Sequence, residues 1–300
     1  MHTHAASSGH GRVTSKQRLR AVVVLAVVAL VVEVVGGFAA RSLALLADAT
    51  HLFADIAALV LAYAAMALAE RVPSHRYTFG LYRAEILAAF VNAEMLLVVT
   101  GFLFYEAYRR IQSPPEIQTG LMIVVAAVGL ATNLVSMAIL RRESEHSLNV
   151  RAAYLEVFSD ALGSFGVLVA AAVMAVSGRF WLDPLVSAAI ALVVLPRAIS
   201  ILRQSAHILL EGTPTEVDVR DLRAQLLRVP GVVELHDLHF WTLTSGLHSA
   251  SVHIRATEES RGEVLREVRR LLRESAGVDH STIQVESGTE VVCETTDHHA

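Results

Sequence analysis

Residues 42–59 read SLALLADATHLFADIAAL, and this stretch decides how the rest of the chain is interpreted. It is apolar enough to lie in a lipid bilayer, yet it contains Asp48, His51 and Asp55. His51 and Asp55 are four residues apart, so on an α-helix they share one face, and Asp48 lies on nearly the same side. Ionisable groups at membrane depth are costly and usually mark an ion or proton path. The simpler alternative is a helix end whose polar groups reach the lipid headgroups.

The composition supports the membrane interpretation. The chain has 300 residues, of which 54% are hydrophobic, and this is too apolar for an ordinary soluble domain. Its formal net charge of -4 argues against a nucleic-acid partner. The single cysteine, Cys293, excludes an intramolecular disulfide framework and a CxxC metal site.

Six apolar runs are long enough to span a bilayer, which takes about 20 residues each. They cover residues 19–40, 43–69, 84–108, 117–140, 152–176 and 181–202. Lysine and arginine are enriched before the first run and in the connections between runs two and three and runs four and five. This bias predicts a multi-pass protein with both termini in the cytoplasm.

The last third of the chain has a different pattern. It predicts helices at 217–228 and 261–274 and strands at 233–242, 248–255 and 280–286, which is the order αββαβ of a small α+β domain. We therefore divide the chain into a polar, histidine-containing cytoplasmic tail (1–17), a six-helix transmembrane domain (18–206), a cytoplasmic metal-binding αββαβ domain (207–288) and a disordered tail (289–300).

The fifth span repeats the spacing of the opening stretch. In YLEVFSDALGSFGVL, Glu156 and Asp160 are four residues apart and share a helical face. Two helices that each offer such a pair can close a four-ligand site with one histidine and three carboxylates, and a closed site suits binding and release better than hydrolysis. The alternative is that Glu156 and Asp160 pair with arginines at one end of the bundle.

Other polar residues have both functional and structural interpretations. Glu33 and Asn133 lie within apolar spans and could line a water-filled route or bridge helices. Arg83 opens the third span and Glu211 follows the sixth, so an ion pair between them could tie the bundle to the cytoplasmic domain. The alternative for that pair is two solvated charges near the headgroups.

The C-terminal domain contains histidines and carboxylates that could bind zinc-like ions. HDLHFWTL supplies His236 and His239, the next strand supplies His253, and the last strand supplies His280 and Glu286. Isolated surface histidines are common, so the prediction depends on these residues meeting in the fold.

With these residues in view, the sequence resembles the cation diffusion facilitator family of divalent-metal transporters, close to its bacterial zinc, cadmium and cobalt efflux branch. The motifs that carry the resemblance, in chain order, are SLALLADATHLFAD, RYTFGLYRAEILAAFVNA, LNVRAAYLEVFSDALGSFGVL, WLDPLVSAAIAL, ILLEGTP and HDLHFWTLTSGLHSASVHI. The resemblance implies six transmembrane helices, a metallochaperone-like αββαβ cytoplasmic domain and a homodimer. It also implies export of Zn²⁺ or a similar ion across the plasma (inner) membrane, driven by inward proton flow through alternating access.

The resemblance also implies roles for individual residues. The family's transport site maps onto His51, Asp55, Glu156 and Asp160, and its charge interlock maps onto Arg83 and Glu211. The family's cytoplasmic metal sites map onto His236, His253, His280 and Glu286. Asp48 and His239 are expected to be accessory.

One position departs from the zinc branch, which usually has histidine where this chain has Glu156. Glutamate adds an oxygen ligand and a negative charge, which makes the site harder. Selectivity for Zn²⁺ over Cd²⁺, Co²⁺, Fe²⁺ and Mn²⁺ is therefore left open. Histidine titrates near neutral pH whereas glutamate ordinarily titrates with a pKa of about 4.3, so the exchange also bears on proton coupling.

Two other function classes were weighed on the sequence. A metal-sensing membrane protein would bind metal and signal to a partner without flux, but the chain shows no appended output domain. An intramembrane hydrolase would need HExxH or an open ligand arrangement beside a base, and neither is present. The sequence therefore predicts a transporter and not an enzyme, with a proton-coupled divalent-cation exporter as the leading hypothesis.

Overall fold

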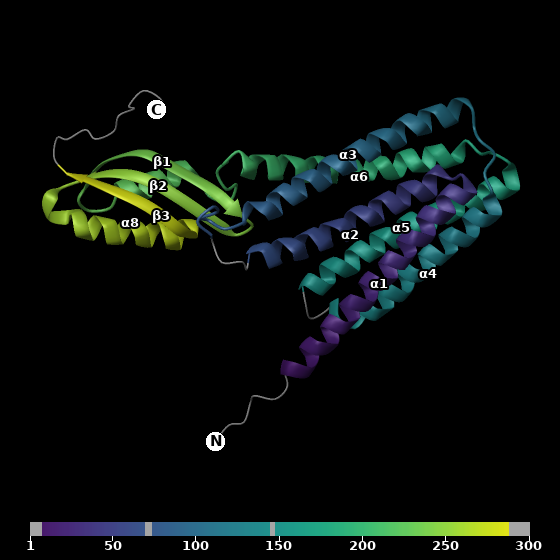
Figure 1. Cartoon of the computed structure of the whole chain (residues 1–300), viewed down its shortest axis with the longest axis horizontal. Coiled ribbons are helices and arrows are strands. Elements are labelled where there is room, and N and C mark those ends of the chain that lie inside the picture. The colour runs from purple at the N-terminus through teal and green to yellow at the C-terminus, as the bar shows by residue number, and fades with distance from the viewer. Residues whose placement is uncertain (1–7, 70–73, 145–147, 288–300) are drawn as a thin grey trace, which may run out of the picture. The chain divides into compact units, whose positions relative to one another are not determined.

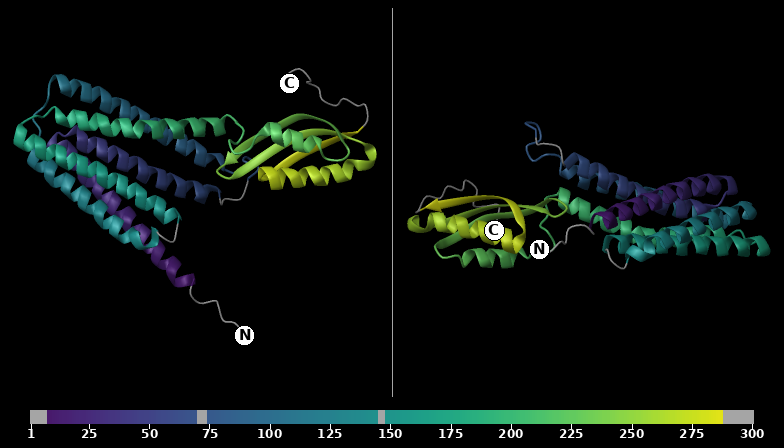
Figure 2. Two further views of the ribbon diagram at one scale, coloured as in Figure 1. Left: turned by 180° about the vertical axis from the view of Figure 1, so that it is seen from behind. Right: turned by 90° about the horizontal axis from the view of Figure 1, so that it is seen from below.

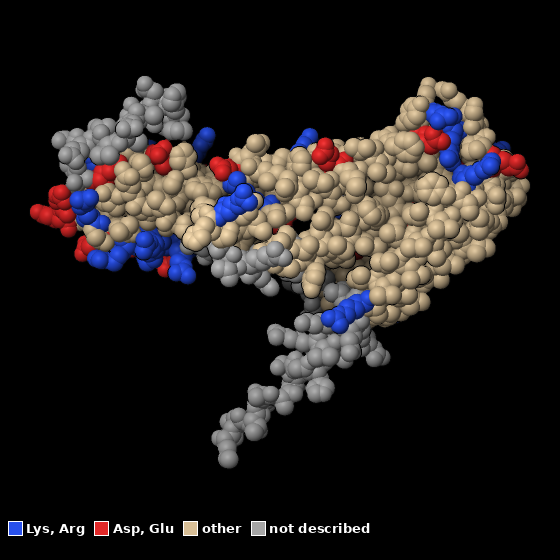
Figure 3. Space-filling view, in the orientation of Figure 1, with Lys and Arg blue, Asp and Glu red and all other residues tan. Residues whose placement is uncertain are grey.

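The computed structural model describes residues 8–69, 74–144 and 148–287 (Figure 1). The described part contains six helices that are long and apolar enough to cross a membrane, as the sequence predicted. They are α1 (Ser8–Ala40), α2 (Leu43–Ala69), α3 (Arg83–Gln112), α4 (Thr119–Ser144), α5 (Leu148–Ser177) and α6 (Leu182–Leu209). Figure 3 shows that the visible face of these helices is almost free of charged side chains, which suits contact with lipid.

The described residues form two compact units, one within Met1–Leu61 and Val91–Ser200 and the other within Ala62–Phe90 and Ile201–Ala300. In the first unit α4 packs against both α1 and α5, and Figure 2 shows these three helices side by side. Their buried faces meet the beginning of α2 in one apolar cluster that includes Leu45, Met122 and Met174. The opposite side of α2 packs on α3 and α6 through a second cluster that includes Leu43 and Leu103. α2 is therefore held on two sides, and this fixes the direction of its polar face.

The start of α2 is fixed by a buried carboxylate from another helix. Asp183, in the first turn of α6, is fully buried and accepts hydrogen bonds from the backbone N–H groups of Leu43 and Ala44 at 2.7 and 3.1 Å. The Ser42 hydroxyl donates to it at 2.6 Å, and Arg110 of α3 lies 3.8 Å from it. Because a helix N-terminus carries unpaired donors and a partial positive charge, this carboxylate acts as a cap. The helices α1 and α2 form a tight hairpin, since only two residues separate them.

The second unit contains the predicted αββαβ order. Its elements are α7 (Val219–Leu227), β1 (Val232–Thr244), β2 (Leu247–Ala256), the short 3-10 helix η1 (Glu258–Ser260), α8 (Arg261–Ala276) and β3 (Val278–Ser287). The sheet order is β1-β2-β3, with β2 antiparallel to β1 and parallel to β3. The helices α7 and α8 share one hydrophobic core with the sheet.

The pattern of α8 explains that core. Val264, Val268 and Leu272 are four residues apart, so they form one stripe, and all three are fully buried. The helix ends at Gly277, whose φ of 60° is in the left-handed region that favours glycine.

Two predicted segments lie partly or wholly outside the described residues. The disordered tail at 289–300 and residues 1–7 of the polar tail are not described, whereas α1 begins at Ser8, well before the apolar run begins. The limits of the four predicted domains remain predictions.

Candidate metal sites

Two helices bring three metal-binding side chains together in the first unit. α2 supplies His51 and Asp55, one helical turn apart, and α5 supplies Asp160. His51 Nδ1 lies 3.7 Å from Asp55 Oδ2, and His51 Nε2 lies 3.5 Å from Asp160 Oδ1. One donor atom from each residue lies within 4.8 Å of the other two. We call these three residues the membrane cluster.

The donor spacing suits a small divalent cation. Zinc bonds of about 2.0–2.1 Å in a tetrahedron place neighbouring ligand atoms roughly 3.3 Å apart. Asp55 and Asp160 approach different ring nitrogens of His51, at 3.7 and 3.5 Å, so the imidazole ring would turn to offer one nitrogen to an ion held by both carboxylates. Asp55 Oδ2 and Asp160 Oδ1 are buried and have no hydrogen-bond partner among the described residues. An unpaired buried carboxylate oxygen is costly, and a bound cation would provide its partner.

Arg197 is a functional candidate that the sequence analysis did not identify. It lies on α6 directly after Pro196, and its Nη1 atom lies 3.2 Å from Asp55 Oδ1 and also pairs with Glu156. The predicted fourth ligand, Glu156, is therefore held by a guanidinium, and the membrane cluster contains only the other three predicted ligands. A basic residue inside a predicted membrane span was the signal that could have identified Arg197.

Asp48 is buried beside the membrane cluster but is not part of it. Its Oδ2 atom accepts a hydrogen bond from Ser164 of α5 at 3.1 Å, and Asn133 of α4 donates to the same hydroxyl at 3.4 Å. Asp48 connects α2, α4 and α5 through these polar groups, and its accessory role stays a prediction.

The second unit holds another group of three ligands, which we call the cytoplasmic cluster. His236 of β1 and His253 of β2 face each other in the antiparallel ladder, and their ring centres are 5.5 Å apart. Glu286 of β3 places Oε2 at 3.5 Å from His236 Nε2 and Oε1 at 3.6 Å from His253 Nδ1. One donor atom from each residue lies within 4.8 Å of the others. Each of the three strands contributes one ligand.

His280, the fourth predicted cytoplasmic ligand, does not join this cluster within the described residues of one chain. It precedes Glu286 by six residues along β3, which is roughly 20 Å of extended strand. Its ring packs edge-on against Phe79 at 5.4 Å, and its carbonyl accepts a hydrogen bond from Ser249 at 3.0 Å. The pairing of these residues places His280 at the opposite end of the sheet.

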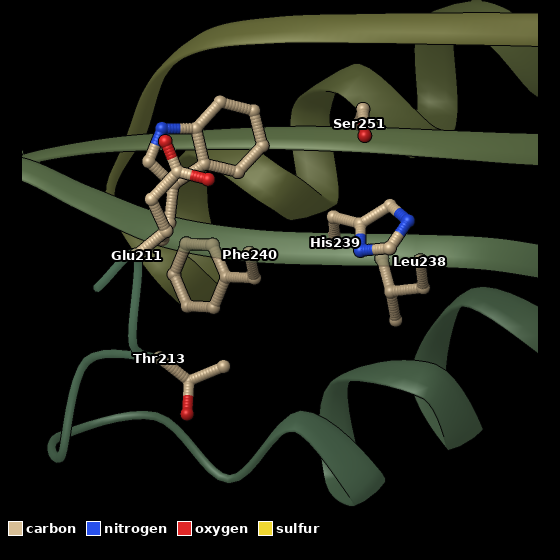
Figure 4. Close-up of a pocket in the computed structure, with 7 residues that line it drawn as sticks. Glu211, Thr213, Leu238, His239, Phe240 and Ser251 are labelled. Atoms are coloured by element: carbon tan, nitrogen blue, oxygen red, sulfur yellow. The ribbon is translucent and has the colours of Figure 1, made fainter. Parts of the chain in front are cut away.

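His239, predicted to be accessory, is connected to the cytoplasmic cluster through Asp237. The ladder slips by one residue between His236 and His239, and Asp237 takes a φ of 54° at this bulge. Asp237 Oδ1 lies 2.9 Å from His239 Nε2, and its Oδ2 lies 3.8 Å from His253 Nε2. Figure 4 shows His239 in a pocket beside Ser251. The bulge therefore places the Asp237 carboxylate beside both His239 and His253.

The predicted pair of Arg83 and Glu211 forms an ion pair with an Nη2 to Oε1 distance of 3.0 Å. Two residues further along α3, Glu85 accepts hydrogen bonds from Thr244 at 2.5 Å and Ser245 at 3.2 Å, at the turn between β1 and β2. The start of α3 is therefore joined both to the end of α6 and to the β1–β2 hairpin.

Comparison with known proteins decides the family. Residues 19–210 match the cation efflux transmembrane domain, and residues 214–288 match the cation efflux protein cytoplasmic domain. The chain belongs to the cation efflux family. It is therefore a multi-pass membrane protein for divalent-cation efflux, and the fold described above is the fold of that family.

Relatives with assigned roles cover most of this cation efflux protein. It is 46% identical over 259 residues to the metal cation efflux system protein CzcD of Cupriavidus metallidurans, covering 86% of this chain and 82% of that protein. It is 39% identical to the cadmium, cobalt and zinc/H(+)-K(+) antiporter of Bacillus subtilis, with coverages of 86% and 85%. It is 37% identical to the zinc transporter ZitB of Escherichia coli, with coverages of 95% and 92%.

Among solved structures, the metal-bound C-terminal domain of the CzcD transporter is 40% identical to this chain. It covers 23% of this chain and 99% of its own length, with a TM-score of 0.22.

Proposed function

We propose that this protein exports Zn²⁺ from the cytoplasm across the plasma membrane in exchange for protons, as a homodimer with both termini in the cytoplasm. The observation that carries the proposal is the membrane cluster, in which an imidazole lies between two carboxylates that each have one buried oxygen without a hydrogen-bond partner among the described residues. Zinc prefers this mixture of imidazole and carboxylate ligands. The names of the relatives support the choice of ion, because they cite zinc, cadmium and cobalt.

The arrangement suggests how the ion is bound and released. The ion takes His51, Asp55 and Asp160 as its first ligands. Arg197 holds Asp55 and Glu156 while the ion is absent, so an arriving ion competes with the guanidinium for Asp55. When Arg197 withdraws, Glu156 becomes free to complete the four-ligand site that the sequence predicted.

Protons can bind the empty site before it turns back to the cytoplasm, and the reason is electrostatic. Departure of a divalent ion leaves carboxylates without their counter-charge at membrane depth, which is unfavourable. Protons that enter from the opposite side neutralise those carboxylates before the site turns back to the cytoplasm. The name of the Bacillus subtilis relative, which cites H⁺ exchange, supports this coupling.

The test is Zn²⁺ flux into liposomes that contain the purified full-length protein and carry an imposed pH gradient. Wild type is expected to accumulate Zn²⁺ against its gradient and to move protons in the opposite direction. Asp55→Asn keeps the shape of the side chain but removes its charge, and it is expected to abolish both fluxes. Glu116→Gln serves as the matched control, because Glu116 is an exposed carboxylate in the α3–α4 connection.

The same preparation tests the choice of ion. Competition by Cd²⁺, Co²⁺, Fe²⁺ and Mn²⁺ is measured in wild type and in Glu156→His. We expect Zn²⁺ to be the best substrate of wild type, because His51 supplies an imidazole ligand, which zinc favours. Full Zn²⁺ flux in Asp55→Asn would contradict the assignment of the transport site. Flux that is unchanged when the pH gradient is collapsed would contradict proton coupling.

A further inference from the structure

A second polar layer lies beside the membrane cluster. It consists of Glu33 of α1, Asp48 of α2, Asn133 of α4 and Ser164 of α5, and all four side chains are buried. Asp48 precedes His51 by three residues, which is close to one helical turn toward the α1–α2 hairpin. The layer therefore lies on the hairpin side of the membrane cluster, at the junction of four helices.

Two glycines make room for the carboxylates in this layer. A Cβ atom on Gly129 would lie 2.6 Å from Glu33 Oε1 and 3.5 Å from Ser164 Oγ. A Cβ atom on Gly163 would lie 3.0 Å from Asp48 Oδ1. Any larger residue at position 129 would overlap the Glu33 carboxylate. The backbones of α4 and α5 thus leave space at the points that the acidic oxygens occupy.

The buried charge of the layer has no counter-charge in the described part of the chain. Glu33 is 3% exposed, and its Oε2 atom has no hydrogen-bond partner among the described residues. The described residues form no ion pair between a basic side chain and either Glu33 or Asp48. An unpaired carboxylate in a bilayer interior is costly unless a cation or proton joins it.

The total charge of the two layers sets the number of cations they can hold. Glu33 and Asp48 add to Asp55, Glu156 and Asp160, and Arg197 is the one basic side chain that the described residues pair with any of them. With His51 neutral and all five carboxylates ionised, these groups would carry a surplus of four negative charges, which cations or protons must neutralise. One divalent ion in the membrane cluster would leave half of that surplus, and a second divalent ion would neutralise the remainder.

We propose that Glu33 and Asp48, together with Asn133 and Ser164, form a second binding site for the transported divalent cation. Its ligand atoms are oxygens, from two carboxylates and the Ser164 hydroxyl, and Asn133 orients that hydroxyl through its Nδ2 atom, so the site is harder than the membrane cluster. The ion passes from the membrane cluster to this site on its way out, and an ion that arrives behind it promotes its release, as in other multi-site pathways. This inference rests on the proposed function, because it places a second stop on the same route.

The test counts the Zn²⁺ ions bound per chain by equilibrium dialysis of the full-length protein. The background is His236→Gln with His253→Gln, so that the cytoplasmic cluster does not contribute. Glu33→Gln is expected to lose one ion relative to this background, and Asp160→Asn is expected to lose a different one, so that the combined variant loses two.

Glycine variants report on the same site without altering a ligand. Gly129→Ala is expected to lose the same ion as Glu33→Gln, because its methyl group would displace the carboxylate. Gly166→Ala is the matched control, since no side chain or neighbouring helix among the described residues lies within 4 Å of the added carbon, and it is expected to keep every ion. In flux assays Glu33→Gln is expected to lower kcat about tenfold with little change in KM, because the membrane cluster still captures the ion.

An unchanged Zn²⁺ count in Glu33→Gln would overturn the proposal, as would an effect of that variant on the pH dependence of flux alone. The failure of the proposed function has a different result, since Asp160→Asn would then keep both its full Zn²⁺ count and its flux.

Discussion

The membrane cluster and the cytoplasmic cluster have nearly the same inner geometry but different surroundings. Each contains three ligands whose donor atoms lie within 4.8 Å of one another. In the cytoplasmic cluster the carboxylate of Glu286 already accepts a hydrogen bond from Gln284 at 3.0 Å, and Asp237 lies between two histidines. In the membrane cluster two carboxylate oxygens have no hydrogen-bond partner among the described residues, and Arg197 lies against one side.

This difference suggests different tasks for the two clusters. Ligands fixed by three paired strands and by their own hydrogen bonds favour stable occupancy, because little reorganises when the ion arrives or leaves. A cluster whose carboxylate oxygens lack hydrogen bonds and whose neighbour is a competing guanidinium favours exchange of the ion. In its ion-free state the carboxylates are only partly neutralised by Arg197. We therefore expect substitutions in the membrane cluster to act on transport and those in the cytoplasmic cluster to act on metal retention.

The largest expected effect is the loss of Zn²⁺ binding in the membrane cluster of Asp160→Asn. Loss of a residue that only supports a metal ligand costs 10- to 100-fold in affinity, so loss of a direct ligand should cost roughly 100-fold or more. The measurement is a Zn²⁺ titration of the full-length protein with the cytoplasmic cluster removed by His236→Gln and His253→Gln. If the affinity for Zn²⁺ stays within a few-fold of that of the protein with His236→Gln and His253→Gln alone, the two clusters have been assigned the wrong roles.

Removal of the competing cation should give the next largest effect. Arg197→Gln is expected to strengthen Zn²⁺ binding on the order of tenfold, a modest value because the guanidinium is about half exposed and partly screened. Turnover should fall, since the ion would leave more slowly. Flux and binding are measured together, with Arg179→Gln as an exposed control in the α5–α6 connection. Weaker binding in Arg197→Gln would show that Arg197 assists the ion instead of competing with it.

The ion pair at the start of α3 should have a smaller effect. Arg83→Glu is expected to reduce flux about fivefold, because partly exposed ion pairs contribute up to about 1 kcal/mol. The charge reversal Arg83→Glu with Glu211→Arg should recover most of that loss. If the flux of the double variant is no higher than that of Arg83→Glu alone, the ion pair does not contribute to transport. Arg203→Gln, an exposed basic residue on α6, is the control.

The smallest effect on transport is expected from the cytoplasmic cluster. His253→Gln should abolish Zn²⁺ retention by that cluster, because it removes the ligand that lies between Asp237 and Glu286. The same variant should change flux by no more than about threefold, since the cluster is not on the proposed route. Zn²⁺ content after gel filtration and flux are compared on one preparation. Loss of flux that matches the loss of retained zinc would contradict the proposed separation of tasks.

The sequence predicted the parts of this protein that depend on local patterns. Apolar runs predicted the six spans because length and composition suffice to recognise a membrane helix. The spacing of four residues predicted that His51 and Asp55 share a face, and the same spacing on α5 predicted a matching pair. The alternation of polar and apolar residues predicted the strands that carry His236 and His253.

The features that the sequence did not predict depend on how distant elements meet. Arg197 lies on another helix, and periodicity does not say which helical faces contact each other. The sequence left open that Glu156 pairs with an arginine, but it did not indicate that this arginine is Arg197. His280 and Glu286 lie on the same strand, and the register of β3 against β2 places Glu286, and not His280, beside His253. The room around Glu33 depends on a glycine of another helix, which only the packed bundle reveals.

The most direct test of the central claim compares the two clusters in one flux experiment. Full-length protein carrying Asp55→Asn with Asp160→Asn, and full-length protein carrying His236→Gln with His253→Gln, are placed in identical liposomes with the same pH gradient. The proposed roles predict no Zn²⁺ transport by the first protein and near-normal initial rates by the second. Transport by the first protein together with its loss in the second would contradict the claim that the membrane cluster carries the ion.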